Sequence, residues 1–340
     1  MKKIQKLVQY TLPIVLALVL LRYAYQGLAL DRLASELQEA RLGWIALSVL
    51  INIASHLLRA YRWSLLLQAT GFQAPVAKTF IALMVGHFIN LFIPRLGELV
   101  RCSVLKRIEG IPVGNSLGTV VTERAVDLLS LLAVVGFAFA IEFKQLSSIL
   151  YQITTENIPQ IVVKTLSFLA IVLLLVLLGS LLLLIGRRDM SSKDKNAFLA
   201  KIQGFIRGLL KGLGSVGTMQ AKKEFAWVTI LMWALYYLIG YVGIFAIVAT
   251  SKLGWMAGLA ILVMGSISML IPVQGGIGAY HLLISSTLLA YGTSKEGGML
   301  YATLMHAAQL LATFFIGGVS AILSTLLSRK QASMHHQHKQ

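Results

Sequence analysis

Long runs of apolar residues constrain this chain more than any other feature. Charged residues make up 13% of its 340 residues and the mean hydropathy is +0.78, whereas an ordinary soluble domain has about 25% charged residues. A helix needs about 20 apolar residues to cross the hydrocarbon core of a bilayer. We therefore expect an all-α polytopic membrane protein with about six full crossings. The predicted crossings are 7–25, 44–67, 114–141, 160–185, 225–249 and 298–327.

Two further apolar regions do not fit one helix each. The regions 78–107 and 255–291 are interrupted near the middle by Pro94 and Pro272, and glycines follow each proline closely. Proline removes a backbone donor and cannot continue a helix without strain. Non-helical backbone at membrane depth is tolerated only inside protein or beside a water-filled cavity. We therefore predict two re-entrant helix pairs.

The predicted elements repeat along the chain. Residues 1–143 and 144–330 each read as helix, interfacial helix, helix, re-entrant pair and helix, and 331–340 form a tail. The amphipathic interfacial helices are expected within 28–43 on the outer side and 191–217 on the cytoplasmic side. Because the second half begins on the opposite side of the membrane, the pattern predicts an inverted repeat.

The basic residues indicate an orientation. The chain has 30 Lys and Arg against 13 Asp and Glu, for a formal net charge of +17. Most of the basic residues fall in loops on the side of the N-terminus, as the positive-inside rule requires of cytoplasmic loops. They do not form one basic face, which argues against nucleic-acid binding. We expect a multi-pass protein of the bacterial inner membrane with both termini cytoplasmic.

The first break has the sequence "IPRLGELVR". A helix starting near Gly97 would direct free N–H groups and the positive end of its dipole toward the break, an arrangement that attracts anions. Arg95 and Arg101 add guanidinium groups suited to phosphate, and Glu98 can pair with either of them. The alternative interpretation is an ion-pair staple of Arg95, Glu98 and Arg101 at the cytoplasmic interface.

A second charged group lies inside a predicted crossing. Glu123, Arg124 and Asp127 are spaced so that they share one flank of a helix. Charges that face lipid are costly, so these three must face protein, water or a ligand. They form either an ion pair between packed helices or a carboxylate site for a substrate headgroup or a proton.

The second break, "IPVQGGIG", carries no charge. Gly275, Gly276 and Gly278 follow Pro272 and allow a ligand to approach the backbone, although a tight turn uses the same residues. His281 is interpreted as a packing residue. The histidine spacing does not resemble a metal site, and we predict no metal, cofactor or catalytic group.

Arg59, Arg62 and Trp63 fall where a predicted crossing approaches the cytoplasmic interface. Basic and aromatic side chains commonly anchor helices at that depth. These three residues are therefore predicted to anchor the helix, with contact to lipid phosphate as the functional variant.

Four motifs follow one another along the chain. They are Arg-x-x-Arg-Trp at 59–63, Asn and Pro ahead of Arg-x-Gly-Glu-x-x-Arg at 90–101, Glu-Arg-x-x-Asp at 123–127, and Pro-x-x-Gly-Gly-x-Gly at 272–278. In this order the sequence resembles the lysylphosphatidylglycerol synthetase transmembrane family, also called flippase-like proteins, the membrane half of the multiple peptide resistance factors. The resemblance implies movement of a lipid between leaflets around a central cavity. We expect no soluble aminoacyl-transferase domain to accompany it.

The leading hypothesis is a translocator of an anionic phospholipid or a polyprenyl phosphate. One alternative is a membrane-embedded transferase or phosphatase that acts on a lipid headgroup. Another is a non-catalytic membrane subunit of a lipid-modifying complex. Besides a membrane lipid, the partners considered are a second copy of the chain and a lipid-modifying enzyme.

Overall fold

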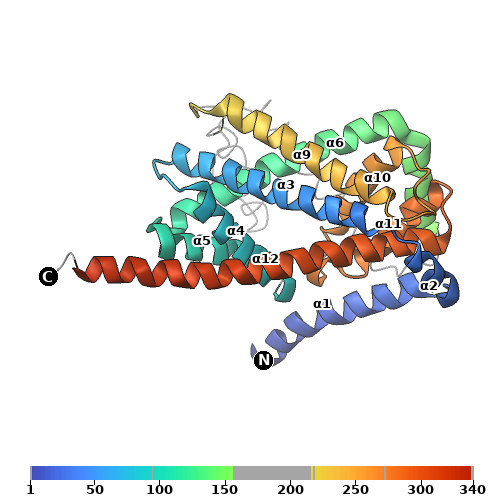
Figure 1. Cartoon of the computed structure of the whole chain (residues 1–340), viewed down its shortest axis with the longest axis horizontal. Coiled ribbons are helices and arrows are strands. Elements are labelled where there is room, and N and C mark those ends of the chain that lie inside the picture. Colours follow the sequence, from blue (N-terminus) through green and yellow to red (C-terminus); the bar gives the residue numbers. More distant parts are fainter. Residues whose placement is uncertain (1, 94, 156–215, 217–218, 272, 338–340) are drawn as a thin grey trace, which may run out of the picture.

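The computed structural model describes residues 2–337, except 94, 156–215, 217–218 and 272. Within this part of the chain every regular element is a helix, which confirms the all-α prediction there. The elements are α1 (Lys2–Tyr25), α2 (Leu30–Gln38), α3 (Leu42–Ala69), α4 (Val76–Phe92), α5 (Gly97–Glu109), α6 (Val113–Thr155), α9 (Lys222–Ile244), α10 (Trp255–Ser268), the short 3-10 turn η1 (Gln274–Gly276), α11 (Ala279–Ala290) and α12 (Lys295–Gln337) (Figure 1).

Four of the described helices, α3, α6, α9 and α12, are long and apolar enough to cross a membrane, and they coincide with four of the predicted crossings. The first predicted crossing, 7–25, lies within α1. The predicted crossing 160–185 and the predicted amphipathic segment 191–217 lie outside the described residues. The C-terminal helix continues to Gln337, into the region predicted as a tail.

The long helices expose apolar side chains as a lipid-facing surface requires. Along α12 the exposed large residues recur every three or four positions, so they form one stripe. In water such a continuous stripe would be unusual for a monomer, whereas in a bilayer it contacts acyl chains. The stripe consists of Leu311, Phe315, Val319, Ile322 and Leu326, each 56–65% exposed.

Two helices are broken where the sequence predicts breaks. The first break separates α4 from α5, and the second separates α10 from α11. With 12 to 17 residues, each of these four helices is too short to cross a membrane alone. Asn90 stabilises the first break, because its Oδ1 accepts a 2.7 Å hydrogen bond from the Gly97 N–H, which opens α5.

The two breaks touch each other. The Gln274 side-chain amide, in the second break, donates a 3.1 Å hydrogen bond to the carbonyl of Phe92, the last residue of α4. That carbonyl has no partner within its own helix, because the helix ends there. Around the breaks, α3 packs beside α9, α4 beside α12 and α10 beside α6 (Figure 1).

The core has two main parts. One surrounds the second break and combines buried residues of α1, α10, α11 and α12, including Leu20, Met264 and Leu283. The other lies between α3, α4, α5 and α6, where Trp63 and Leu105 are completely buried. The second part packs against the charged residues described below.

The end of the molecule that contains α2 supports one prediction about pH. Glu36 lies in α2, outside the candidate spans, and burial together with the Glu296 carboxylate raises its pKa above the usual 4.5. A raised pKa means that the folded state loses stability as the pH rises from 4.5 through the folded-state pKa. We therefore expect Glu36→Gln to raise the apparent melting temperature in detergent by roughly 1–3 °C at pH 8.

The same measurement at pH 4 gives the control, because the carboxyl is then protonated in both states and the gain should vanish. Glu39→Gln, at an exposed carboxylate in the same segment, should change the melting temperature less. A gain for Glu36→Gln that is equal at both pH values would contradict this explanation.

Candidate functional site

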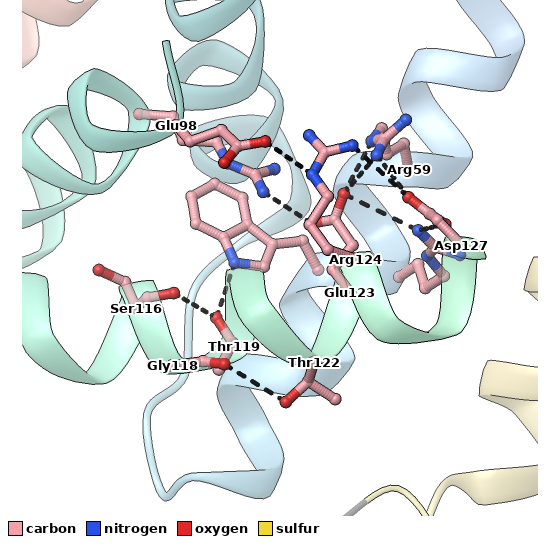
Figure 2. A network of polar contacts seen from close by, with 12 residues as sticks. Arg59, Glu98, Ser116, Gly118, Thr119, Thr122, Glu123, Arg124 and Asp127 are labelled. Atoms are coloured by element: carbon pink, nitrogen blue, oxygen red, sulfur yellow. Dashed lines mark hydrogen bonds and ion pairs between the residues drawn. The ribbon is translucent and has the colours of Figure 1, made fainter. Parts of the chain in front are cut away.

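Charged side chains from α3, α5 and α6 converge in one network (Figure 2). Arg59 lies ten residues before the end of α3, and Glu123 lies ten residues after the start of α6. At 1.5 Å per residue, both are about 15 Å from those helix ends. We define the charged cluster as Arg59, Arg62, Glu98, Arg101, Glu123, Arg124 and Asp127.

Glu123 is the centre of the charged cluster. Its side chain is completely buried, and each carboxylate oxygen accepts a hydrogen bond from a different helix. Arg59 Nε donates to Oε1 at 2.8 Å from α3, while Arg101 Nη2 donates to Oε2 at 3.0 Å from α5. Arg62 Nη2 lies 3.8 Å from Oε1. Glu123 thereby joins α3, α5 and α6.

Asp127 lies one helical turn further along α6 and also joins two arginines. Arg59 Nη2 donates to its Oδ2 at 2.7 Å, and Arg62 Nη2 donates to its Oδ1 at 2.5 Å. Arg59 extends the network to α9, because its Nη1 donates to the Tyr236 hydroxyl at 3.2 Å. The two arginines of the first motif are therefore held by carboxylates of the third.

Glu98 and Arg124 form the rim of the charged cluster. Arg124 Nε lies 2.6 Å from Glu98 Oε1, and their side chains are 44% and 36% exposed. An exposed pair of this kind adds little to stability, about 0–1 kcal/mol. The sequence predicted a partner for Glu98 at Arg95 or Arg101, whereas the structure pairs it with Arg124 across the contact between α5 and α6 (Figure 2).

The charged cluster has an excess of positive charge. Four arginines face three carboxylates, so one cation is not neutralised within it. Arg62 is completely buried and Arg101 is 2% exposed. The Nε and Nη1 atoms of both residues are buried and have no hydrogen-bond partner among the described residues. Buried donors without partners are costly, so this arrangement suits an anion that brings acceptor oxygens.

Trp63 orients one of these cations. The Arg101 guanidinium lies 4.6 Å from the centre of the Trp63 ring, and the indole N–H donates to Thr119 Oγ1 at 2.9 Å. A cation over an aromatic face is attracted electrostatically. From the sequence, Arg59, Arg62 and Trp63 were predicted to lie at the membrane interface, where they would contact lipid. In the structure Arg62 and Trp63 are completely buried.

Arg95 lies apart from the charged cluster. It is exposed at the first break with φ of +68°, a backbone conformation that non-glycine residues seldom adopt. Gly97 begins α5 as predicted, but its N–H is bound by Asn90 and is not free for a ligand. Of the predicted first-break residues, Glu98 and Arg101 join the charged cluster, whereas Arg95 does not. Pro94 lies outside the described residues.

The second break is a turn of three glycines with positive φ. The φ values are +58° at Gly275, +76° at Gly276 and +82° at Gly278, and Pro272 lies outside the described residues. Two histidines bind this turn, and one of them, His281, was interpreted from the sequence as a packing residue. His306 Nε2 lies 2.7 Å from the Gly275 carbonyl, and His281 Nδ1 accepts a 3.3 Å hydrogen bond from the Gly278 N–H.

Comparison with known proteins places this architecture in a family. The family described as "Lysylphosphatidylglycerol synthase TM region" matches residues 10–317. The chain belongs to this family. The match confirms the resemblance that the four motifs indicated, and it spans the charged cluster and both breaks. It also identifies the chain as a membrane protein with several apolar helices.

Two curated proteins are similar in sequence to this chain. The chain is 26% identical to "UPF0104 membrane protein MJ1595" of Methanocaldococcus jannaschii over 42% of this chain and 44% of that protein. It is 22% identical to "Glycosyltransferase AglD" of Haloferax volcanii over 92% of this chain and 54% of that protein. The chain therefore spans about half the length of the curated relatives it matches. No solved structure matches it.

Proposed function

We propose that this member of the lysylphosphatidylglycerol synthase transmembrane-region family moves an anionic or phosphate-bearing lipid between the leaflets of the bacterial inner membrane. The supporting observation is the buried excess of positive charge in the charged cluster. Within the part of the chain that the structure describes, Arg62 and Arg101 each keep two guanidinium nitrogens without a partner. A lipid phosphate supplies both the missing negative charge and the missing acceptors. Carboxylates Glu98, Glu123 and Asp127 hold the arginines in place and set the local charge.

The helix arrangement supports an inverted repeat around this site. The contacts of α4 with α12 correspond to those of α10 with α6, and α3 packs against its counterpart α9. Paired broken helices at corresponding positions are typical of transporters whose binding site lies near the bilayer midplane. In this arrangement the first break provides the charged side of the site, the glycine turn at 275–278 provides the neutral side, and both termini are cytoplasmic.

The proposal is tested by leaflet exchange of fluorescent lipids in reconstituted vesicles, with quenching from outside. Arg62→Lys and Arg101→Lys keep the positive charge but remove the planar fork. We expect each to slow exchange of an anionic lipid by about tenfold or more, the effect of losing one charge-assisted hydrogen bond. Arg107→Lys is the matched control, since Arg107 is exposed at the end of α5 and outside the charged cluster.

Two other outcomes distinguish the rival functions. Equal exchange by wild type and both lysine variants would remove these arginines from the transport site. Absence of exchange for every lipid, together with headgroup turnover seen by mass spectrometry, would favour a membrane-embedded transferase or phosphatase. The printed name of the relative "Glycosyltransferase AglD" makes that assay worthwhile. Co-purification of a stoichiometric enzyme, with activity only in its presence, would favour a non-catalytic subunit.

A further inference from the structure

The two guanidinium groups proposed to hold a lipid phosphate are covered in this structure. Arg62 is completely buried and Arg101 is 2% exposed. A phosphate oxygen must come within about 2.7–2.9 Å of their nitrogens to bind, and it cannot do so while both side chains are covered. Entry of a lipid headgroup therefore requires part of the surrounding structure to open.

A single hydrogen bond between described residues holds the two breaks together. The Gln274 amide donates it to the Phe92 carbonyl at 3.1 Å, and we call this pair the break contact. Phe92 is 51% exposed and Gln274 is half-buried. Both groups are uncharged, so their bond contributes less than the charge-assisted bonds that hold Glu123. The break contact therefore opens at a lower cost than the buried ion pairs.

The helices on either side of the break contact pack more closely. A Cβ at Gly317 in α12 would lie 2.6 Å from the Phe88 Cβ in α4. On the other side, a Cβ at Gly278 would lie 2.7 Å from the Ala17 carbonyl oxygen in α1. Backbones this close lose many van der Waals contacts when they separate. Separation of the two breaks therefore costs less than separation of either helix contact.

The first break leads to the exposed rim of the charged cluster. Glu98 follows the residue that opens α5, and its partner Arg124 is 44% exposed. Arg101 lies four residues after Gly97, which is about 6 Å along the helix. A headgroup that enters beside the first break therefore meets the rim first and Arg101 next.

Backbone strain is present in the same segment. Arg95, between Phe92 and Gly97, has a φ of +68°, which is unfavourable for a residue with a Cβ. Residues held in such conformations are frequent in segments that switch between two arrangements. A movement that releases Phe92 also allows Arg95 to leave the strained conformation.

We propose that the break contact is a gate: Gln274 releases Phe92 to admit the lipid headgroup to the charged cluster, and binds it again to close the site. The second break, which carries no charge, thereby controls access to Arg101 and Arg62. This inference rests on the proposed lipid translocation and adds the step that makes the buried site accessible.

A reducible crosslink across the break contact tests the gate in reconstituted vesicles. The variant carries Phe92→Cys and Gln274→Cys, which a short bifunctional methanethiosulfonate reagent joins, while the native Cys102 is buried and stays in every variant. A closed gate admits no headgroup, so we expect the crosslink to slow exchange of fluorescent phosphatidylglycerol by about tenfold or more. A reducing agent should restore the rate.

The matched control joins Gln145 and Ala290 in the same way. The Gln145 amide donates a 2.8 Å hydrogen bond to the carbonyl of Ala290, the last residue of α11. This pair has the same chemistry as the break contact but lies at the end of α11 that is remote from the second break. Crosslinking Gln145→Cys to Ala290→Cys should leave the exchange rate unchanged.

The variant Gln274→Met tests the hydrogen bond itself. Methionine keeps a long side chain but cannot donate, so the closed state loses one bond and the gate opens more often. We expect exchange about threefold to tenfold faster than in wild type. Gln145→Met loses the same kind of bond and should show no gain. Replacing a residue that only stabilised the fold would slow exchange or leave it unchanged, so the direction of the effect separates the two roles.

Full exchange by the protein crosslinked between residues 92 and 274 would overturn the gate and leave the proposed translocation standing. A rate for Gln274→Met at or below that of wild type would overturn the gate as well. So would equal inhibition by the crosslink between residues 145 and 290. Absence of exchange in wild type would instead overturn the proposed translocation, and this inference with it.

Discussion

Replacing Glu123 with glutamine is expected to destabilise the protein more than any other single charge change. Glu123 is completely buried and binds Arg59 and Arg101 through separate oxygens, with Arg62 nearby. An amide keeps the shape but removes the charge, so the excess of the charged cluster rises from one to two positive charges. Removing one partner of a buried ion pair costs about 3–5 kcal/mol. The apparent melting temperature in detergent should fall by roughly 10 °C.

The matched control for this prediction is Glu109→Gln. Glu109 also belongs to an ion pair of α5, with Lys78 of α4, but the lysine side chain is 36% exposed. A partly solvated pair of this kind contributes about 1 kcal/mol or less, so the melting temperature should change by only a few degrees. Equal losses for the two variants would show that Glu123 is no more important for stability than Glu109.

Sequence reasoning located the breaks because their signals are local. Proline and glycine act on the backbone of their immediate neighbours. The predicted interruption at "IPRLGELVR" therefore coincides with the gap between Phe92, which ends α4, and Gly97, which begins α5. The same reasoning placed the second break at the glycine turn 275–278, where three positive φ values occur.

Sequence reasoning could not assign the partners of the charges. Arg59 and Glu123 are 64 positions apart in the chain, and Arg62 and Asp127 are 65 positions apart. Their pairing depends on how α3 packs against α6, which no local pattern specifies. Position near the end of an apolar run made Arg59 and Arg62 resemble interfacial anchors. Their placement beside a fully buried Trp63 is a consequence of tertiary packing.

The histidine contacts could not be predicted from the sequence either. His281 was interpreted alone as a packing residue, which is what a single histidine on a helix usually is. In the structure four histidines form two pairs, His56 with His87 and His281 with His306, and the second pair binds the glycine turn of the second break. The two members of each pair lie on different helices, so their contact cannot be predicted from residue spacing and is seen only in the folded structure.

Replacing Gly97 with alanine is expected to separate α5 from α4 and so displace the charged cluster. A Cβ at residue 97 would lie 2.0 Å from the Gly86 carbonyl oxygen and 2.7 Å from the Asn90 side chain. Relieving this contact would require the α4 backbone to move and would break the hydrogen bond from the Gly97 N–H to the Asn90 side chain. Overpacking usually costs 1–3 kcal/mol, and a clash with backbone should cost about 3 kcal/mol or more. Both the apparent melting temperature and the lipid exchange rate measure this loss.

Arg101 makes the second readout informative, because it lies one turn after Gly97 and reaches Glu123 only while α5 stays against α4. A folded Gly97→Ala protein should therefore exchange lipid as slowly as Arg101→Lys. Gly118→Ala is the matched control, since residue 118 lies in α6 and no atom of the described residues lies within 4 Å of a Cβ placed there. Alanine favours a helix over glycine by about 1 kcal/mol, so this control should be neutral or slightly stabilised. If Gly97→Ala and Gly118→Ala gave the same melting temperature and the same lipid exchange rate, the close contact between α4 and α5 at Gly97 would not be needed to position Arg101.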